Sequence, residues 1–209
     1  MAYFPMFVEI EDRPCLVAGG GMVALRKVEK LLEFQARVTV IAPKIIPKLK
    51  ELAAASGGRL CLIQREFVAE DVRDCFLVIA ATDDHVLNHQ IAEAARAAGI
   101  PVNAVDQKED CSFMFSSMVK KGDLVAAFSS SGKSPIVTQY LKAQMEEQMT
   151  DYLGQVNDLL GRYRSVVKAR FETEAERKEA FRRIFELCME GDKLPADSLI
   201  EQIVSNPGR

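Results

Sequence analysis

The sequence predicts an α/β protein in which a parallel sheet carries helices on both faces, followed by a small α+β region and a helical C-terminal part. Three observations support this fold class. Short apolar runs alternate with helical stretches up to Asp106, two strand-like runs then meet across a turn, and a helical pattern continues from Pro135. The 209 residues are 48% apolar, which is enough for a packed core.

The first strand is expected at Leu16-Val17-Ala18, an apolar run typical of a buried parallel strand. A helix is expected at 22–34, because apolar residues recur there at helical spacing between charged ones. The β-branched run Arg37–Ile41, closed by Ala42-Pro43, completes a βαβ unit. The alternation continues with a helix at 46–55, strands at 60–63 and 76–81, a helix at 85–98 and a strand at 101–104.

The pattern changes after residue 106. Runs 112–115 and 124–128 are strand-like, and the turn Lys120-Lys121-Gly122-Asp123 between them predicts a hairpin. Ser134-Pro135 predicts a helix start, and Thr173 with Glu176 predicts a capping box. We therefore expect three parts: a sheet domain at 1–113, a connecting region at 114–150 and a helical C-terminal domain at 151–209.

Composition gives no support to several classes of partner and site. The 27 Lys and Arg against 30 Asp and Glu give a net charge of -3, which provides no whole-chain argument for binding nucleic acid or an acidic membrane. The five cysteines are scattered without a C-x-x-C pair, which argues against a disulfide framework or a zinc knuckle. The N-terminal residues do not resemble an export signal, and no apolar run approaches the roughly 18 residues of a membrane span. We expect a cytoplasmic protein.

Three glycines indicate a nucleotide site. The run Gly19-Gly20-Gly21-Met22-Val23-Ala24 fits the pattern G-x-G-x-x-A between a strand and a helix, which favours a Rossmann-like fold with a diphosphate at the helix N-terminus. The alternative is a glycine-rich turn that holds no ligand. We expect the cofactor to contact Gly19, Gly20, Gly21, Met22, Val23 and, after the second strand, Ala42, Pro43 and Lys44. An Asp or Glu at the end of that strand usually binds the adenosine ribose. This sequence has none there, so this feature does not distinguish NAD from NADP.

Polar residues follow two further strands. Asp106 comes after the strand at 101–104, where it would lie at the same sheet edge as the glycines and is a candidate general base. Thr82 and Asp83 would flank the nicotinamide or its ribose, with Asn88 supporting their loop; a helix N-cap is the equally weighted alternative. His85 and His89 share a helix face, but without a third ligand we expect no metal site there.

A serine-rich loop offers donors to an anion. The segment Ser129 to Lys133 precedes the helix that starts at Ser134-Pro135, so hydroxyls, N–H groups and a cation are available to a carboxylate. The alternative is a solvated capping loop. Ser130, Ser131, Lys133 and Ser134 are the candidate substrate-binding residues of this loop.

Several separated motifs together resemble one enzyme family. The chain carries F-P-M-F, then C-L-V-A-G-G-G-M-V-A-L-R-K, A-A-T-D-D with Asn88, N-A-V-D at 103–106, C-S-F and S-S-S-G-K-S-P at 129–135. In this order they resemble the siroheme synthase family, more narrowly its stand-alone precorrin-2 dehydrogenase and sirohydrochlorin ferrochelatase module.

The resemblance implies a reaction, a substrate and a quaternary state. It implies NAD-dependent oxidation of precorrin-2 to sirohydrochlorin, possible insertion of ferrous iron, Asp106 as the catalytic aspartate and Asn103 as a substrate contact. It also implies a homodimer built on the region at 114–150. Two other classes stay open: an NAD-sensing module without enzymatic activity, and a dehydrogenase that does not insert metal.

Overall fold

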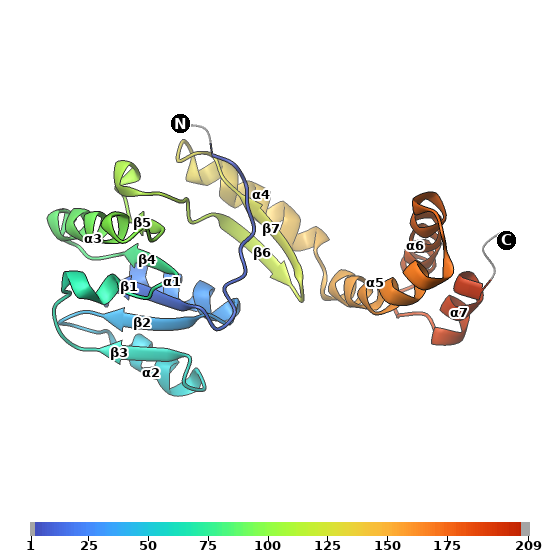
Figure 1. Ribbon diagram of the computed structural model, residues 1–209, viewed down its shortest axis with the longest axis horizontal. Helices are drawn as coiled ribbons and strands as arrows, with labels where there is room; N and C mark the ends of the chain where they lie inside the picture. Colours follow the sequence, from blue (N-terminus) through green and yellow to red (C-terminus); the bar gives the residue numbers. More distant parts are fainter. Residues whose placement is uncertain (1–2, 206–209) are drawn as a thin grey trace. The chain divides into compact units, whose positions relative to one another are not determined.

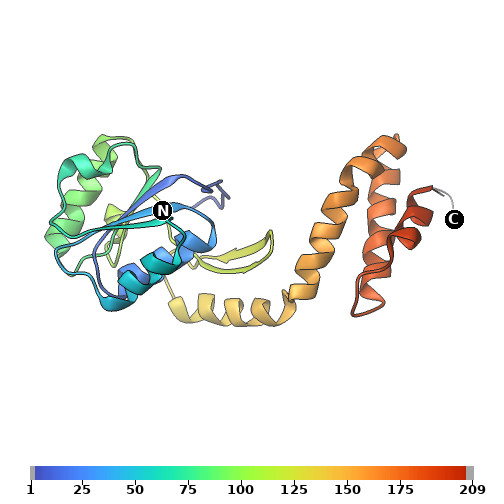
Figure 2. The same cartoon turned by 90° about the horizontal axis from the view of Figure 1, so that it is seen from below.

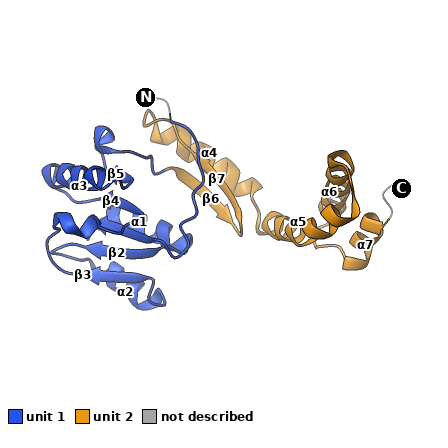
Figure 3. Ribbon diagram, viewed as in Figure 1, with its two compact units in different colours: residues 1–115 blue, residues 116–209 orange. Residues whose placement is uncertain are grey.

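The computed structural model describes residues 3–205. Residues 1–2 of the predicted sheet domain and residues 206–209 of the predicted C-terminal domain lie outside the described residues. The chain separates into two compact units, residues 1–115 and 116–209 (Figure 3). The division into three parts that the sequence suggests stays a prediction. Each unit has its own secondary structure and its own hydrophobic core.

The first unit is a five-stranded parallel sheet with helices, which confirms the predicted fold class (Figure 1). The elements in order are β1 (Pro14–Ala18), α1 (Met22–Glu33), β2 (Arg37–Ile41), α2 (Pro47–Ala55), β3 (Leu60–Ile63), the short 3-10 helix η1 (Ala69–Val72), β4 (Leu77–Ala80), α3 (His85–Ala97), β5 (Val102–Ala104) and the 3-10 helix η2 (Lys108–Asp110). Each strand and helix predicted before residue 106 is present to within two residues at each end.

Both faces of this sheet are covered. Along β1, Cys15 and Val17 pack in the core beside α1 and α2, whereas Leu16 and Ala18 pack in the core beside α3. Successive side chains of a strand point to opposite faces, so a strand buried on both faces must be apolar throughout. This is why the central strands β1 and β4 are uninterrupted apolar runs.

The strand order determines which loops form the candidate site. The order is β3-β2-β1-β4-β5, so the direction of winding reverses between β1 and β4. In open parallel sheets, ligands bind at the carboxyl ends of the strands beside such a reversal. The segments that follow β1, β2, β4 and β5 therefore form the candidate site.

The second unit begins with an antiparallel hairpin and continues as helices. Its elements are β6 (Ser117–Lys121), β7 (Leu124–Phe128), α4 (Pro135–Gln148), α5 (Asp151–Arg170), α6 (Glu174–Met189) and α7 (Asp197–Ser205). The predicted strand at 112–115 is wrong. Lys121 pairs with Leu124, which leaves a two-residue loop at Gly122-Asp123 and fixes the partner strand immediately before that loop.

Helix starts in the second unit follow the sequence signals. Ser134 caps α4 by accepting a hydrogen bond from the Val137 N–H, and Thr173 and Glu176 form the predicted capping box of α6. Helices α5, α6 and α7 pack around a shared apolar core that includes Leu159, Ile184 and Ile200 (Figure 2). Among residues 3–205, no helix combines the length and hydropathy needed to cross a lipid bilayer.

Candidate functional site

The glycine turn after β1 is packed tightly against its neighbours. Gly19 has a φ of 127°, and a Cβ there would lie 2.2 Å from the carbonyl oxygen of Ala81. A Cβ on Gly20 would lie 2.0 Å from the carbonyl oxygen of Lys44. The backbone of the turn therefore lies directly against the segments after β4 and β2. Neither Gly19 nor Gly20 accommodates a side chain without movement of the backbone.

Gly21 differs from both of these glycines. A Cβ there would meet no atom within 4 Å, and Gly21 is the N-cap of α1 without any side-chain cap. The first turn of α1 also contains no acidic residue. Open space, uncapped N–H groups and the positive end of the helix dipole all suit a phosphate group. The residues present therefore fit the diphosphate of a dinucleotide, and Met22 and Val23 lie half-exposed beside it.

The segment after β2 is held against the turn. The Ile46 N–H donates a hydrogen bond to the Gly20 carbonyl oxygen over 3.0 Å. Ala42 is buried, whereas Pro43 and Lys44 are exposed. The arrangement leaves Pro43 and Lys44 beside the glycine turn, and their contact with the cofactor stays a prediction.

The loop after β4 is ordered by a buried amide. Asn88 is 1% exposed; its Nδ2 donates to the Thr82 carbonyl oxygen over 3.2 Å, and its Oδ1 accepts from the Thr82 N–H over 3.1 Å. Asp84 caps α3 by accepting from Val86 and Leu87 N–H groups. Asn88 therefore supports the loop as expected, Asp84 is the helix cap, and Asp83 is exposed at the sheet edge.

Asp106 follows β5 in a turn with a φ of 59°. The residue is exposed, and no hydrogen bond to its side chain is present among the described residues. It lies at the carboxyl edge of the sheet, as the glycine turn does. A carboxylate that is exposed and free of hydrogen bonds from the protein can accept a proton from a substrate.

A buried carboxylate anchors the segment that carries Asp106. Asp110 is 4% exposed, and its Oδ1 accepts hydrogen bonds from His89 Nδ1 over 2.8 Å and Arg96 over 3.0 Å. Its Oδ2 accepts from Gln107 Nε2 over 3.0 Å. Burial raises the pKa of Asp110, but the hydrogen bonds from His89 and Arg96 outweigh burial, so the pKa lies below its usual value.

A partly buried lysine in α1 was not among the candidate residues. Lys27 of α1 is partly buried, and its Nζ lies 3.9 Å from the centre of the Phe115 ring. Burial lowers the pKa of Lys27, while Cys111 and Asp106 oppose that shift electrostatically. Helical spacing could have indicated this burial from the sequence. Lys27 lies three residues after buried Ala24 and four before buried Leu31, on the helix face that packs against the core.

Asn103 points into the protein. It is 6% exposed, and its Nδ2 donates to the Phe113 carbonyl oxygen over 3.1 Å. This hydrogen bond holds the chain after η2 alongside β5, which explains why residues 112–113 lie beside β5 and not in the hairpin. A contact between Asn103 and substrate stays a prediction.

The serine loop belongs to the second unit. Ser130 Oγ accepts from the Ser134 N–H over 3.0 Å, and Ser129 Oγ accepts from the Ser131 N–H over 3.1 Å. Ser131 has a φ of 56°, and Lys133 is exposed. These bonds order the loop at the start of α4 and leave the Lys133 side chain exposed.

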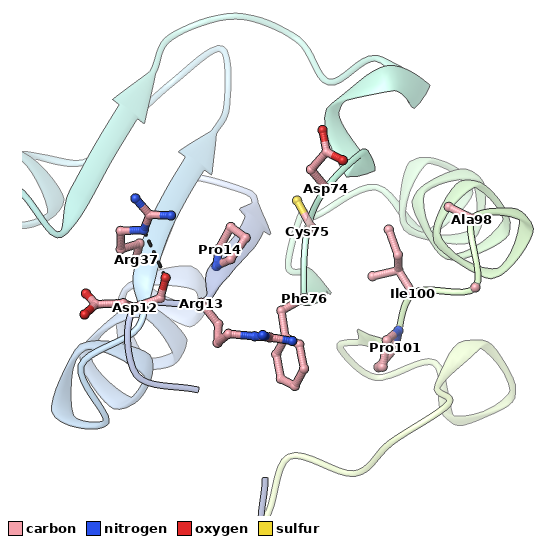
Figure 4. Close-up of a pocket in the computed structure, with 11 residues that line it drawn as sticks. Asp12, Arg13, Pro14, Arg37, Asp74, Cys75, Phe76, Ala98, Ile100 and Pro101 are labelled. Atoms are coloured by element: carbon pink, nitrogen blue, oxygen red, sulfur yellow. Dashed lines mark hydrogen bonds between the residues drawn. The ribbon is translucent and has the colours of Figure 1, made fainter. Parts of the chain in front are cut away.

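A surface hollow lies at the opposite edge of the first unit's sheet. It has a volume of about 790 Å³ and is lined by residues at the amino ends of the strands, among them Pro14, Arg37 and Pro101 (Figure 4). Arg13 lies over the Phe76 ring at 4.6 Å, and Arg37 Nε donates to the Asp12 carbonyl oxygen. The hollow is therefore separate from the glycine turn and from Asp106.

Comparison with known proteins identifies related sequences and folds. Residues 6–117 match the model of a family described as "Putative NAD(P)-binding". The siroheme synthase of Nitrosospira multiformis is 38% identical over 213 residues, covering 99% of this chain and 45% of the relative. That of Stutzerimonas stutzeri is 39% identical over 186 residues, covering 89% of this chain and 40% of the relative. The resemblance to the siroheme synthase family is thus confirmed. The chain spans less than half the length of these curated relatives.

A solved structure shares the fold. The protein described as "SirC, precorrin-2 dehydrogenase" aligns with 97% of this chain and 100% of its own at a TM-score of 0.70 and 21% identity. The fold is therefore similar although the sequences have diverged.

Proposed function

The chain belongs to the NAD(P)-binding family whose model covers residues 6–117, and from that premise we propose that it catalyses the NAD-dependent oxidation of precorrin-2 to sirohydrochlorin. The names of the relatives and of the structural neighbour support the substrate. The observation that carries the proposal is the open N-terminus of α1 at Gly21, at the same sheet edge as the exposed Asp106.

The reaction divides between cofactor and protein. When bound, NAD supplies the hydride acceptor. The substrate loses two hydrogens in all, one as hydride and one as a proton, so the products are sirohydrochlorin, NADH and a proton. The uncapped N–H groups of α1 bind the diphosphate, the loop held by Asn88 adjoins the nicotinamide half, and the Asp106 carboxylate accepts the proton.

The serine loop binds substrate in this proposal. Precorrin-2 carries several carboxylates, and the ammonium of Lys133 with the hydroxyls of Ser130 and Ser131 suits them chemically. We expect Lys133→Ala to raise the KM for precorrin-2 without changing the NAD dissociation constant, with a smaller effect at high salt because ions screen the attraction. Steady-state kinetics at two ionic strengths measure this. An unchanged KM at low salt would leave the loop as a helix cap alone.

A homodimer is also part of the proposal. Helix α4 buries none of its residues within the chain, and Ile136, Val137 and Tyr140 are 76%, 52% and 63% exposed. A contiguous apolar helix face of this kind is typical of an interaction surface. Light scattering should give twice the mass of the chain, and Tyr140→Glu should lower it. A monomeric wild type at micromolar concentration would contradict this part.

The decisive experiment incubates the purified protein with precorrin-2 and NAD. We expect sirohydrochlorin and NADH to appear in equal amounts, with no reaction when the dinucleotide is omitted, and a parallel assay with NADP measures the preference. Failure to form sirohydrochlorin while NAD binds would favour the sensing module. Ferrous ion is then added: metal insertion faster than in a protein-free control would establish the second activity, and no acceleration would leave the dehydrogenase alone.

A further inference from the structure

The candidate base lies in a strained turn of four residues. The Gln107 N–H donates to the Ala104 carbonyl oxygen over 3.4 Å, and Asp106 occupies the third position of this turn with a φ of 59°. A residue other than glycine in this region costs free energy, so the conformation persists only where the surroundings fix the turn. The direction of the Asp106 carboxylate therefore depends on what holds Ala104 and Gln107.

The sheet holds the first end of the turn. Ala104 is the last residue of β5, is 3% exposed and pairs with Ala80 of β4. The next residue, Val105, donates its N–H to the Ala80 carbonyl oxygen over 2.9 Å. This end cannot move unless the sheet opens.

The side chain of Gln107 holds the second end. Its Nε2 donates to Asp110 Oδ2 over 3.0 Å and to the His85 carbonyl oxygen over 3.1 Å. Its Oε1 lies 3.1 Å from His85 Nδ1. His85 is the first residue of α3, so one amide group joins the turn of Asp106 to the start of that helix.

The ionised Asp110 determines the direction of each of these hydrogen bonds. Despite its burial, Asp110 has a pKa below its usual value because His89 and Arg96 donate hydrogen bonds to it, so near pH 7 it only accepts. The His85 carbonyl oxygen also only accepts, and the NH2 group of Gln107 therefore faces both. This leaves Oε1 to accept from His85 Nδ1, which carries the hydrogen.

The start of α3 also belongs to the loop on the cofactor side of the site. Thr82, Asp83 and Asp84 directly precede His85, and Asn88 of the same helix holds Thr82 by hydrogen bonds. In the proposed function this loop adjoins the nicotinamide half of the dinucleotide. Gln107 therefore connects the loop beside the hydride acceptor to the turn that carries the proton acceptor.

We propose that Gln107 is a positioning residue: its amide locks the turn of Asp106 to the start of α3 and so fixes the carboxylate relative to the nicotinamide loop. Gln107 itself contacts neither dinucleotide nor tetrapyrrole. The proposal rests on the proposed function. The two fail in different ways, because a wild type that does not oxidise precorrin-2 removes both, whereas an active wild type with an unaffected Gln107 variant removes only the role of Gln107.

The test begins with two replacements of Gln107. Gln107→Met keeps the length of the side chain and makes none of its hydrogen bonds, so kcat should fall by about tenfold, since a misplaced catalytic group costs up to about 10²-fold. The KM for precorrin-2 and the NAD dissociation constant should stay nearly unchanged. Gln107→Glu keeps the shape but turns an acceptor oxygen toward Asp110, so it should be at least as slow. Wild-type kcat in either variant would overturn the proposal.

Two further variants show whether Gln107 acts through Asp106. Gln107→Met combined with Asp106→Asn should be no slower than Asp106→Asn alone. His85→Ala loses only the bond to Oε1 and keeps the backbone carbonyl, so its loss of kcat should be smaller than that of Gln107→Met. Multiplied losses in the double variant, a larger loss in His85→Ala, or a raised KM with unchanged kcat in Gln107→Met would each contradict the positioning role.

Two controls separate positioning from a general loss of stability. Gln90→Met replaces an exposed glutamine of α3 and should leave kcat unchanged. Val38→Ala removes buried volume at the amino end of β2, away from both loops, so it should lower thermal stability without lowering kcat at a temperature where it is folded. A loss of kcat in Val38→Ala as large as that in Gln107→Met would reduce Gln107 to a structural role and overturn the proposal.

Hydrogen–deuterium exchange gives a readout that needs no activity. Without any ligand, peptides covering residues 104–111 should exchange faster in Gln107→Met than in the wild type, because the turn is released at one end. Peptides covering α1 should exchange equally in both proteins, and circular dichroism verifies the fold. Equal exchange of residues 104–111 in the two proteins would show that the amide does not hold the turn.

Discussion

The three consecutive glycines are constrained in different ways, and this separates folding from ligand binding. Backbone atoms of Ala81 and Lys44 would collide with a Cβ on Gly19 or Gly20, whereas the space beside Gly21 is open. We expect Gly21→Asp to fold normally and to lose NAD affinity at least tenfold, because it places a negative charge where the diphosphate lies. Isothermal titration calorimetry measures the affinity.

Gly20→Ala is the control for this prediction. Its Cβ would approach the Lys44 carbonyl oxygen to 2.0 Å, so we expect lower thermal stability in this variant and not in Gly21→Asp. Unchanged NAD binding by a folded Gly21→Asp protein would remove the turn from the cofactor site.

Asp106→Asn tests the proton acceptor at the scale of one functional group. The amide keeps the size of the side chain but cannot accept a proton at neutral pH. General-base catalysis contributes about 10²–10⁴-fold, so we expect a loss of kcat in this range with unchanged NAD affinity. Any metal insertion should fall with it. Normal oxidation of precorrin-2 by this variant would exclude Asp106 as the base, and Asp83 would be the next residue to replace.

At the scale of elements, a buried carboxylate joins η2 to α3. Asp110 receives hydrogen bonds from His89 and Arg96, both on α3, and from Gln107 beside Asp106. Gln107 Nε2 also donates to the His85 carbonyl oxygen. The two histidines of α3 thus support the segment that carries the candidate base.

Asp110→Asn should weaken this connection in a pH-dependent way. Hydrogen bonds to a charged group contribute about 1.5–3 kcal/mol each, so we expect a comparable loss in the free energy of unfolding at pH 7. The folded-state pKa is lowered, so the contribution is complete above the unfolded value of about 3.9 and is lost as pH falls through the folded value. Urea unfolding at pH 7 and near pH 3 measures the difference. An equal loss of unfolding free energy in Asp110→Asn at both pH values would contradict a role for the charged carboxylate.

Elements of the first unit were predictable because local sequence and tertiary packing agree. The bounds of β2 and β3 coincide with those expected, since β-branched and apolar runs end there at clear breaks. The hairpin strand was misplaced because its position follows from pairing across Gly122-Asp123 and not from its own composition. Asp110 and Lys27 were not predicted because their partners are distant in sequence; His89, for example, is 21 residues away from Asp110.

At the scale of the whole molecule, the two units have separate cores. The core of α5, α6 and α7 contains Ile184, which is fully buried, and it shares no residue with the cores of the sheet. Ile184→Ala should therefore destabilise the second unit by about 2–5 kcal/mol through loss of burial and the cavity left behind. The NAD dissociation constant should be unchanged. Denaturant unfolding and calorimetry measure the two quantities, and a weaker NAD affinity in the folded variant would show that the units are coupled.

The backbone at Asp106 has an evolutionary consequence. Its φ of 59° lies in the left-handed region, where glycine is the least costly residue and aspartate is tolerated at some cost. Asp106→Gly should therefore fold at least as stably as the wild type while losing dehydrogenase activity, which thermal denaturation and kinetics would establish. Selection for stability alone would favour glycine here. A homologue that is no longer selected for catalysis could carry glycine at this position without loss of stability. The residue at this turn would therefore distinguish catalytically active homologues from inactive ones.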